Sequence, residues 1–161
     1  MARLTRGHVS AVANEQLSGK QLVALAIEVS DNAVAPHSRF HVGAALESED
    51  GIIYTGCNVE SDSYGLTICA ERVALTKALS EGARSFNRIA IIGIQYDENG
   101  VPAKQEHGVT EIDGLGPCGA CRQLLWDHCR DIEVIGGTSN GEVGRVWRLA
   151  NLLPDAFHID R

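Results

Sequence analysis

The sequence predicts an α/β fold in which helices cover a mixed sheet of roughly five strands. A strongly apolar segment with helical spacing occupies residues 22–29. The run Ile-Ala-Ile-Ile-Gly-Ile at 89–94 is continuously apolar, which is typical of a strand buried on both faces. Further helical and strand-like segments alternate along the chain, and this alternation favours a layered sandwich.

Three helices are expected, each with an identifiable beginning or end. The first begins after Ser18, a residue type that is favoured at helix N-caps. The second follows a polar loop at 58–66 and is stopped by Gly82. The third begins at the Pro117-Cys118 step, because proline is favoured at the first helical position. The expected helices cover residues 19–32, 67–80 and 118–129.

Five short strands account for most of the remaining chain. An acidic turn at 47–51 joins the first two, and a turn rich in glycine and asparagine at 136–141 joins the last two. Residues 96–116 show no clear periodicity, and a loop of that length in a compact domain commonly borders a functional site. The tail at 151–157 closes the domain. The expected strands cover residues 40–46, 52–57, 87–95, 132–135 and 143–149.

Length and composition limit the possible classes of protein. The chain has 161 residues, which predicts one domain over 18–161, with residues 1–17 as an extension to which no structure is assigned. Its net charge of −7 and its scattered basic residues argue against a nucleic-acid partner, which requires clustered Lys and Arg. The longest apolar runs are too short to cross a bilayer, so no membrane partner is expected.

The cysteine count points to metal or catalytic chemistry. No apolar core follows the basic residues Arg3 and Arg6, so the N-terminus does not resemble a signal peptide. A cytoplasmic, reducing location is therefore expected. Five cysteines, an odd number, fit metal binding or catalysis better than a disulfide framework.

Three of the cysteines have the spacing of a zinc site. Cys118 and Cys121 are three residues apart at the start of the third helix, so both sulfurs face one side of its first turn. Cys69 lies similarly near the start of the second helix. Helix N-termini lower the pKa of nearby thiols and favour the thiolates that bind zinc.

A fourth protein ligand would distinguish a structural zinc site from a catalytic one. Cys129 is about 12 Å along the helix from Cys121, at about 1.5 Å per residue, so neither Cys129 nor His128 can share the ion. Cys57 and His107 remain possible fourth ligands. The favoured interpretation is an open fourth position, which is typical of catalytic zinc.

Two charged residues follow Cys69 closely. Glu71 is placed to accept and return a proton beside a zinc-activated water. Arg72 can donate to the thiolates and offset the negative charge of three sulfur ligands. Elsewhere in a chain, two such residues would ordinarily be interpreted as charges on an exposed helix face. Here the neighbouring zinc ligand favours roles in proton transfer and charge compensation.

These residues resemble those of the cytidine deaminase family, in particular its small homotetrameric nucleoside branch. The similarity covers roughly residues 20–157 and rests on five motifs. The motifs are Ser38-Arg-Phe40-His-Val-Gly-Ala-Ala-Leu46, Gly56-Cys-Asn58-Val-Glu60, Tyr64-Gly-Leu-Thr-Ile-Cys69-Ala-Glu71-Arg72, Pro117-Cys118-Gly-Ala-Cys121-Arg-Gln123 and Leu152-Leu-Pro-Asp-Ala-Phe157.

The resemblance implies a three-layer α/β/α sandwich around a mixed five-stranded sheet, with one Zn²⁺ per subunit. Cys69, Cys118 and Cys121 match the zinc ligands. The implied reaction is attack of activated water at carbon 4 of the pyrimidine. Glu71 matches the group that protonates ring nitrogen 3 and then delivers a proton to the departing ammonia.

The resemblance also implies contacts to a pyrimidine nucleoside. Phe40 matches the aromatic that packs on the base, and the backbone of Ala70 matches a contact to the base edge. Asn58 and Glu60 match the pair that binds the ribose 3′-hydroxyl; in extended backbone, residues two apart point the same way. Phe157 matches an aromatic that reaches the site of a neighbouring subunit, so a homotetramer is implied. On the residues alone, two other interpretations remain open: Phe40 as an ordinary core residue and Glu60 as a solvated loop charge.

The sequence departs from the family pattern in two places. Ser61-Asp62 stands where a small neutral residue is usual. A carboxylate at Asp62 would lie towards the 5′ side of the sugar and repel a phosphate, which favours nucleosides over nucleotides. The 96–116 segment is also longer than expected, and it would widen substrate acceptance if it borders the pocket.

The leading hypothesis is hydrolytic deamination of cytidine and deoxycytidine to the uridines, as in pyrimidine salvage. One alternative is a related deaminase that accepts N4- or ring-substituted cytidines or a blasticidin-type antibiotic. A non-catalytic, zinc-stabilised module belongs to a different class and would bind zinc without turnover. A polynucleotide-editing deaminase is disfavoured by the acidic balance of the chain.

Overall fold

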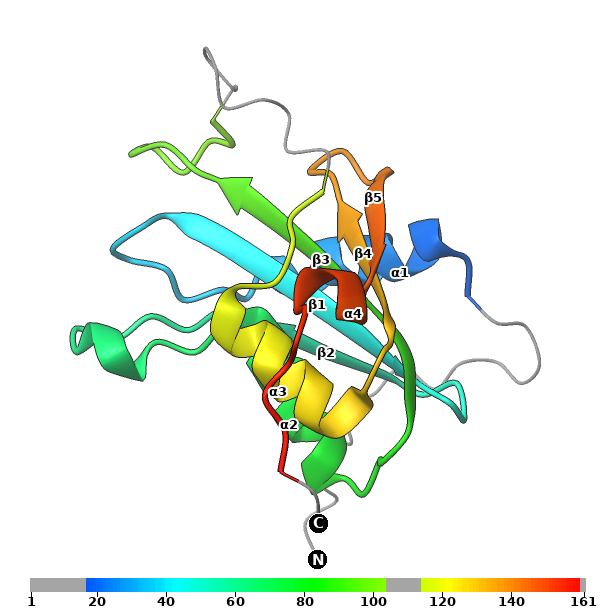
Figure 1. Ribbon diagram of the computed structural model, residues 1–161. Helices are drawn as coiled ribbons and strands as arrows, with labels where there is room; N and C mark the ends of the chain where they lie inside the picture. Colours follow the sequence, from blue (N-terminus) through cyan, green and yellow to red (C-terminus); the bar gives the residue numbers. More distant parts are fainter. Residues whose placement is uncertain (1–16, 104–113, 160–161) are drawn as a thin grey trace, which may run out of the picture.

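The computed structural model describes residues 17–103 and 114–159, and within them the chain forms a single five-stranded sheet with helices on both faces. The strand order is β2-β1-β3-β4-β5. Only the central β3–β4 pair is parallel, and the other neighbouring pairs are antiparallel. The predicted mixed sheet is therefore confirmed (Figure 1).

The first helix, α1 (Gly19–Ser30), begins where the sequence predicts it. Ser18 and Gln21 form a capping box, in which each side chain accepts a hydrogen bond from the other residue's backbone N–H. Leu22, Val23 and Ala26 are buried. The cap fixes the first turn, and the apolar stripe fixes which face of α1 meets the sheet.

The strands β1 (Phe40–Ser48), β2 (Ile53–Cys57) and β3 (Phe86–Gln95) are neighbours in the sheet. β1 lies between β2, which forms one edge, and β3, which is the central strand. Alternate residues of β1 point to opposite faces: Ala44 and Leu46 belong to the core below α2, whereas Ala45 belongs to the core below α1. This alternation divides the interior into two cores, one on each side of the sheet.

The remaining elements lie between residues 64 and 80 and between residues 119 and 152. A short 3₁₀ turn, η1 (Tyr64–Leu66), precedes α2 (Ala70–Ser80), so the helix begins three residues later than predicted. The helix α3 (Gly119–Cys129) lies beyond residues 104–113, which are outside the described part of the chain. The last elements are β4 (Glu133–Gly137), β5 (Val143–Arg148) and α4 (Leu149–Leu152).

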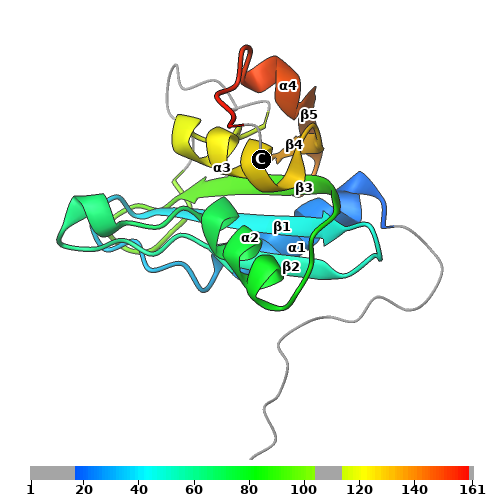
Figure 2. The same cartoon turned by 60° about the horizontal axis from the view of Figure 1, so that its bottom comes forward.

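The elements form three layers, as predicted. Figure 1 shows α2 and α3 in front of the sheet and α1 behind it, and Figure 2 shows the same sheet turned by 60°. One core lies between the sheet and the α2–α3 side, and the other lies between the sheet and α1. The two layers of helices therefore shield both faces of β3, which explains its continuous apolar run.

Gly43 in β1 brings α1 close to the sheet. A Cβ atom at this position would lie 1.8 Å from the backbone oxygen of Ala26, so only glycine fits. The contact packs the helix directly on the strand that leads to Phe40.

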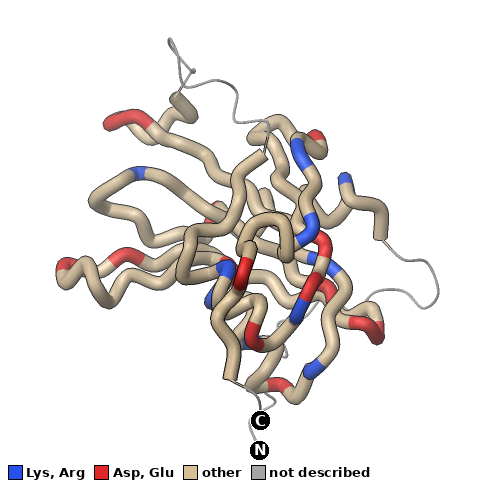
Figure 3. The backbone as a smooth tube through the Cα atoms, viewed as in Figure 1, with Lys and Arg blue, Asp and Glu red and all other residues tan. Residues whose placement is uncertain are grey.

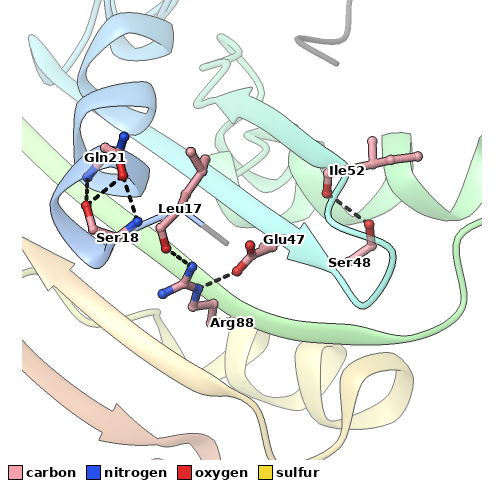
Figure 4. Close-up of polar contacts among 7 residues, drawn as sticks. All are labelled: Leu17, Ser18, Gln21, Glu47, Ser48, Ile52 and Arg88. Atoms are coloured by element: carbon pink, nitrogen blue, oxygen red, sulfur yellow. Dashed lines mark hydrogen bonds and ion pairs between the residues drawn. The ribbon is translucent and has the colours of Figure 1, made fainter. Parts of the chain in front are cut away.

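A buried ion pair joins β1 to β3 and to the start of α1. Glu47 is 2% exposed and pairs with Arg88, whose guanidinium also donates to the carbonyl of Leu17 (Figure 4). The Arg88 side chain thus neutralises the Glu47 carboxylate inside the sheet layer. It also provides a hydrogen-bond donor for the Leu17 carbonyl, just before α1 begins.

The charges of the described residues are distributed over many elements. Figure 3 shows Lys and Arg interspersed with Asp and Glu along the backbone instead of gathered in one stripe. Within residues 17–103 and 114–159, no helix is both long enough and apolar enough to cross a membrane.

Candidate metal and catalytic site

Three cysteines from two separate parts of the chain meet at one point. The sulfurs of Cys69, Cys118 and Cys121 all lie within 4.8 Å of one another. The Cys69 and Cys118 sulfurs are 3.9 Å apart. Sulfurs bound to one tetrahedral zinc at about 2.3 Å are about 3.8 Å apart, so the observed cluster fits a zinc ion.

Two of the three cysteines occupy the N-cap positions of helices. Cys69 caps α2 and Cys118 caps α3, both with extended backbone and without a side-chain capping hydrogen bond. Their sulfurs are therefore available to a metal and lie at the positive end of a helix dipole. Pro117 precedes the N-cap of α3, so its predicted place as the first helical residue is wrong by two positions.

The three sulfurs lie close enough to share protons. The hydrogen bond from Cys121 lowers the pKa of the Cys69 thiol to about 5. The same contact raises the pKa of Cys121, which is fully buried. A thiolate at Cys69 is the form that binds zinc, so the cluster is prepared for a cation.

The other cysteines lie outside this cluster in the described part of the chain. Cys129, at the far end of α3, is half-buried, and desolvation raises its pKa to about 12. Cys57, one of the two possible fourth ligands, ends β2 and is absent from the group of potential metal ligands. His107, the other, lies outside the described residues. A tetrahedral zinc ion held by these three sulfurs alone would have one position left for another ligand.

Glu71 is a buried carboxylic acid next to the cluster. It belongs to the first turn of α2 and is only 4% exposed. Desolvation raises its pKa, and the nearby charge of Cys69 acts in the same direction. A raised pKa brings a carboxyl group closer to the range in which it can both accept and donate a proton.

Arg72 lies on the same turn and contacts both the loop and a sulfur. Its Nη2 donates to the carbonyl of Thr67 at 2.7 Å and lies 3.9 Å from the Cys69 sulfur. The guanidinium therefore offsets negative charge at the cluster and fixes the loop that leads to Cys69.

Asn58 is buried and bridges the strand that carries Phe40. Its amide donates to the carbonyl of Phe40 at 2.9 Å and accepts from the backbone N–H of Val42 at 2.8 Å. The side chain thus reaches toward residues 37–42, on the same side as that of Glu60.

Glu60 is held by a turn two residues before Phe40. Its Oε1 accepts from the Ser38 hydroxyl at 2.5 Å, and its Oε2 accepts from the backbone N–H groups of His37 and Ser38. Desolvation opposes ionisation, but these donated hydrogen bonds prevail and lower the pKa of Glu60. The sequence interpretation assigned Ser38 no role; its only signal was its place in the motif with Phe40.

Phe40 and Ala70 lie on the side of the sheet that carries α2 and α3. A Cβ added to Gly93 would lie 2.3 Å from the Phe40 ring and 3.0 Å from Leu115, so these side chains pack over the glycine. Leu115 belongs to the long 96–116 segment, whose end therefore borders Phe40; residues 104–113 lie outside the described residues. Ala70 is fully buried at the start of α2.

Phe157 differs from the other expected contacts because it lies on the surface. It is 70% exposed, and its backbone oxygen accepts a hydrogen bond from Gln123 of α3 at 2.8 Å. The structure of one chain therefore gathers the cysteines, Glu71 and Arg72, while it leaves the Phe157 ring in solvent.

The chain is similar in sequence to known cytidine deaminases. Residues 18–136 match the family described as the cytidine and deoxycytidylate deaminase zinc-binding region. The chain is 40% identical over 139 residues to a cytidine deaminase of Halalkalibacterium halodurans, with 86% of this chain and 92% of the relative covered. It is 38% identical over 140 residues to a cytidine deaminase of Sporosarcina psychrophila, with 86% and 90% covered.

The fold agrees with solved structures of the same family. The crystal structure of cytidine deaminase from Burkholderia pseudomallei superimposes with a TM-score of 0.73 at 40% identity, covering 88% of this chain and all of that one. The cytidine deaminase from Mycobacterium tuberculosis gives a TM-score of 0.68 at 34% identity, covering 89% and 99%. With its cluster of three cysteines and this similarity over most of its length, the chain belongs to the zinc-binding cytidine and deoxycytidylate deaminase family.

Proposed function

We propose that the protein catalyses the hydrolytic deamination of cytidine and deoxycytidine to uridine and deoxyuridine, with release of ammonia. The observation that carries the proposal is the buried Glu71 carboxyl beside a cluster of three cysteine sulfurs that fits zinc. A closed structural site would use a fourth protein ligand and would need no buried acid.

The residues of the chain divide the work of the reaction. A zinc ion held by the three sulfurs would supply the Lewis acidity that makes water a nucleophile near neutral pH. Glu71 takes one proton of the attacking water and passes it to ring nitrogen 3. It then takes the remaining proton from the new hydroxyl on carbon 4 and delivers it to the amino group, so that the C4–N bond breaks, ammonia leaves and a carbonyl remains at carbon 4. Arg72 stabilises the negative charge of the sulfurs through its contact with Cys69.

The substrate contacts follow from the residues around this centre. Phe40 offers an aromatic surface for the base, and the backbone of Ala70 lies at the start of the helix that carries Glu71. Asn58 and Glu60 both reach toward residues 37–42, so we assign them to the ribose 3′-hydroxyl. Their hydrogen bonds to the protein fix their directions before the sugar arrives.

A nucleoside is the favoured substrate over a nucleotide. Asp62 is fully exposed and lies 3.2 Å from His37, next to the turn that holds Glu60. A carboxylate at this edge repels a 5′-phosphate, and its partner is a histidine instead of the Lys or Arg that phosphates usually require. Turnover of dCMP comparable with that of deoxycytidine would contradict this assignment.

An ultraviolet assay over a panel of substrates tests the function. Cytidine, deoxycytidine, dCMP and N4-methylcytidine are offered to one preparation whose zinc content is measured. We expect turnover of the first two with about one zinc per chain. A chain that retains zinc but leaves every substrate unchanged would contradict the enzyme assignment and support a structural zinc module.

Broadened acceptance of modified nucleosides is the second candidate. Leu115 packs beside Phe40, so the long segment that ends there borders the base contact. The chain is also 29% identical over 102 residues to a blasticidin-S deaminase of Bacillus cereus, with 61% of this chain and 64% of that protein covered. The Asn58 and Glu60 pair weighs against the antibiotic, because a substrate without ribose has less use for it.

Assembly into a cytoplasmic homotetramer completes the proposal. Five apolar side chains beside the site are exposed and form what we call the rim patch: Val34, Val59, Tyr64, Leu66 and Ile68. Backbone bridges join Val34 to Val59 and Val59 to Ile68, so part of this surface is continuous. An exposed apolar surface of this kind is typical of a subunit interface, and Phe157 is free to reach a neighbouring site. The five free cysteines suit a reducing compartment.

A further inference from the structure

The Ser38 hydroxyl lies between two of the proposed substrate contacts. It donates to Oε1 of Glu60 at 2.5 Å and accepts from the backbone N–H of Phe40 at 3.0 Å. A hydrogen bond to a charged carboxylate at this distance is among the stronger ones in proteins. One side chain thus connects the sugar side of the site to the strand that carries the base contact.

Glu60 has few other groups to orient it. Its Oε2 accepts from the backbone N–H groups of His37 and Ser38 at 2.8 and 3.2 Å, whereas among the described residues Ser38 supplies the one side-chain donor. Backbone donors hold the carboxylate at one oxygen only. The Ser38 hydroxyl holds the other oxygen and so fixes the rotation of the carboxylate about its last bond.

Phe40, by contrast, is fixed without Ser38. Its ring packs over Gly93, its carbonyl accepts from Asn58, and its backbone is paired with Gln95 in the sheet. Removal of the Ser38 hydroxyl would therefore disturb the sugar side far more than the base side.

The backbone around Ser38 is also held in a fixed conformation. Arg39 has a φ of 55°, a left-handed conformation that is rare for residues other than glycine. The Gln95 side chain donates to the carbonyls of both Ser38 and Arg39, which stabilises this turn independently of the serine hydroxyl.

We infer that Ser38 is a positioning residue that aims the Glu60 carboxylate at the ribose 3′-hydroxyl. The inference deepens the proposed nucleoside deaminase function and rests on it. Ser38 does not touch the substrate in this scheme, because its hydroxyl is used by Glu60 and by the backbone of Phe40.

The test compares Ser38→Ala with wild type on two substrates, cytidine and 3′-deoxycytidine. We expect kcat/KM for cytidine to fall about tenfold, because a hydrogen bond to a charged group is lost, while kcat/KM for 3′-deoxycytidine falls less than about twofold. Ser38→Thr keeps the hydroxyl and should restore cytidine turnover. Ser80→Ala removes another exposed serine hydroxyl, one that bonds only within α2, and serves as the matched control.

A double variant separates positioning from general damage. In a Glu60→Ala background, which lacks any group for the Ser38 hydroxyl to orient, adding Ser38→Ala should cost no further cytidine turnover, because the two residues act as one unit. Equal losses on both substrates, or additive losses in the double variant, would overturn the inference. A wild-type enzyme that turns over neither substrate would instead overturn the deaminase function itself, and this inference with it.

Discussion

Cys69 and Cys118 show how a single position can combine structure and chemistry. As N-caps they leave their helix unassisted by a side-chain hydrogen bond, although Ser, Thr, Asp or Asn at that position stabilises a helix by about 1 kcal/mol. The sulfurs lie instead within reach of Cys121. The chain thus forgoes two capping hydrogen bonds in favour of a metal-binding cluster.

At the residue scale, Glu71→Gln should slow turnover strongly without loss of the metal. The amide cannot transfer a proton, so we expect kcat to fall about 10²- to 10⁴-fold. The measurement pairs the ultraviolet assay with metal analysis of the same sample. Glu81→Gln, at the exposed C-cap of the same helix, is the control. Near-normal activity of Glu71→Gln would remove the carboxyl from the mechanism.

The sequence was informative about the metal cluster because its chemistry is local. Two cysteines three residues apart at a helix start must face one side, and only the approach of Cys69 required tertiary structure. The hydrogen bonds of Glu60 were not predictable, because their donors lie in a tight turn at residues 37–38, and the next residue, Arg39, has a left-handed backbone. No pattern of residue types indicates that a bulky arginine will adopt a positive φ.

At the element scale, Gly43→Ala tests how closely α1 lies on β1. The added Cβ would meet the Ala26 carbonyl oxygen at 1.8 Å, so the helix must move. We expect a loss of about 1–3 kcal/mol in the free energy of unfolding, as for other overpacked cores. Gly65→Ala meets nothing within 4 Å and should leave the denaturant midpoint nearly unchanged. Equal midpoints would show that α1 shifts freely.

The buried ion pair offers a second prediction at this scale. Arg88→Met leaves Glu47 charged and unpaired inside the protein, which should cost about 3–5 kcal/mol in thermal or denaturant unfolding. Adding Glu47→Gln should recover part of this loss. Lys20→Met removes the exposed partner of Glu142 and should cost less than about 1 kcal/mol. Similar losses from the buried and exposed pairs would contradict this account.

Element types were predicted more accurately than their ends. The three main helices and five strands were expected from periodicity, and the capping box confirms the start of α1. The sequence interpretation extended the last strand to Leu149, which instead begins α4. Leu149 is fully buried. A buried apolar residue is expected both at the end of a strand and at the start of a helix, so its residue type does not distinguish the two.

For the whole molecule, complementation tests whether sites are shared between subunits. Phe157→Ala lacks the proposed neighbouring aromatic, and Glu71→Gln lacks the proposed proton shuttle. Co-expressed chains should form mixed tetramers in which an intact Glu71 meets an intact Phe157 of another subunit. We expect the mixture to be more active than either variant alone. Light scattering measures the mass of the assembly and so checks that the chains form tetramers. Activity that never exceeds the better single variant would indicate self-contained sites.

The position of the cluster between α2 and α3 has a mechanical consequence. Its first and second cysteines are 49 positions apart, and β3 with the long segment after it lies between them. An ion bound by cysteines at both ends of this loop would hold the two ends together, much as a disulfide bond restricts an unfolded chain. Removal of the ion by a chelator should therefore shorten the lifetime of the folded protein as well as abolish its activity. The same ion would serve both catalysis and stability.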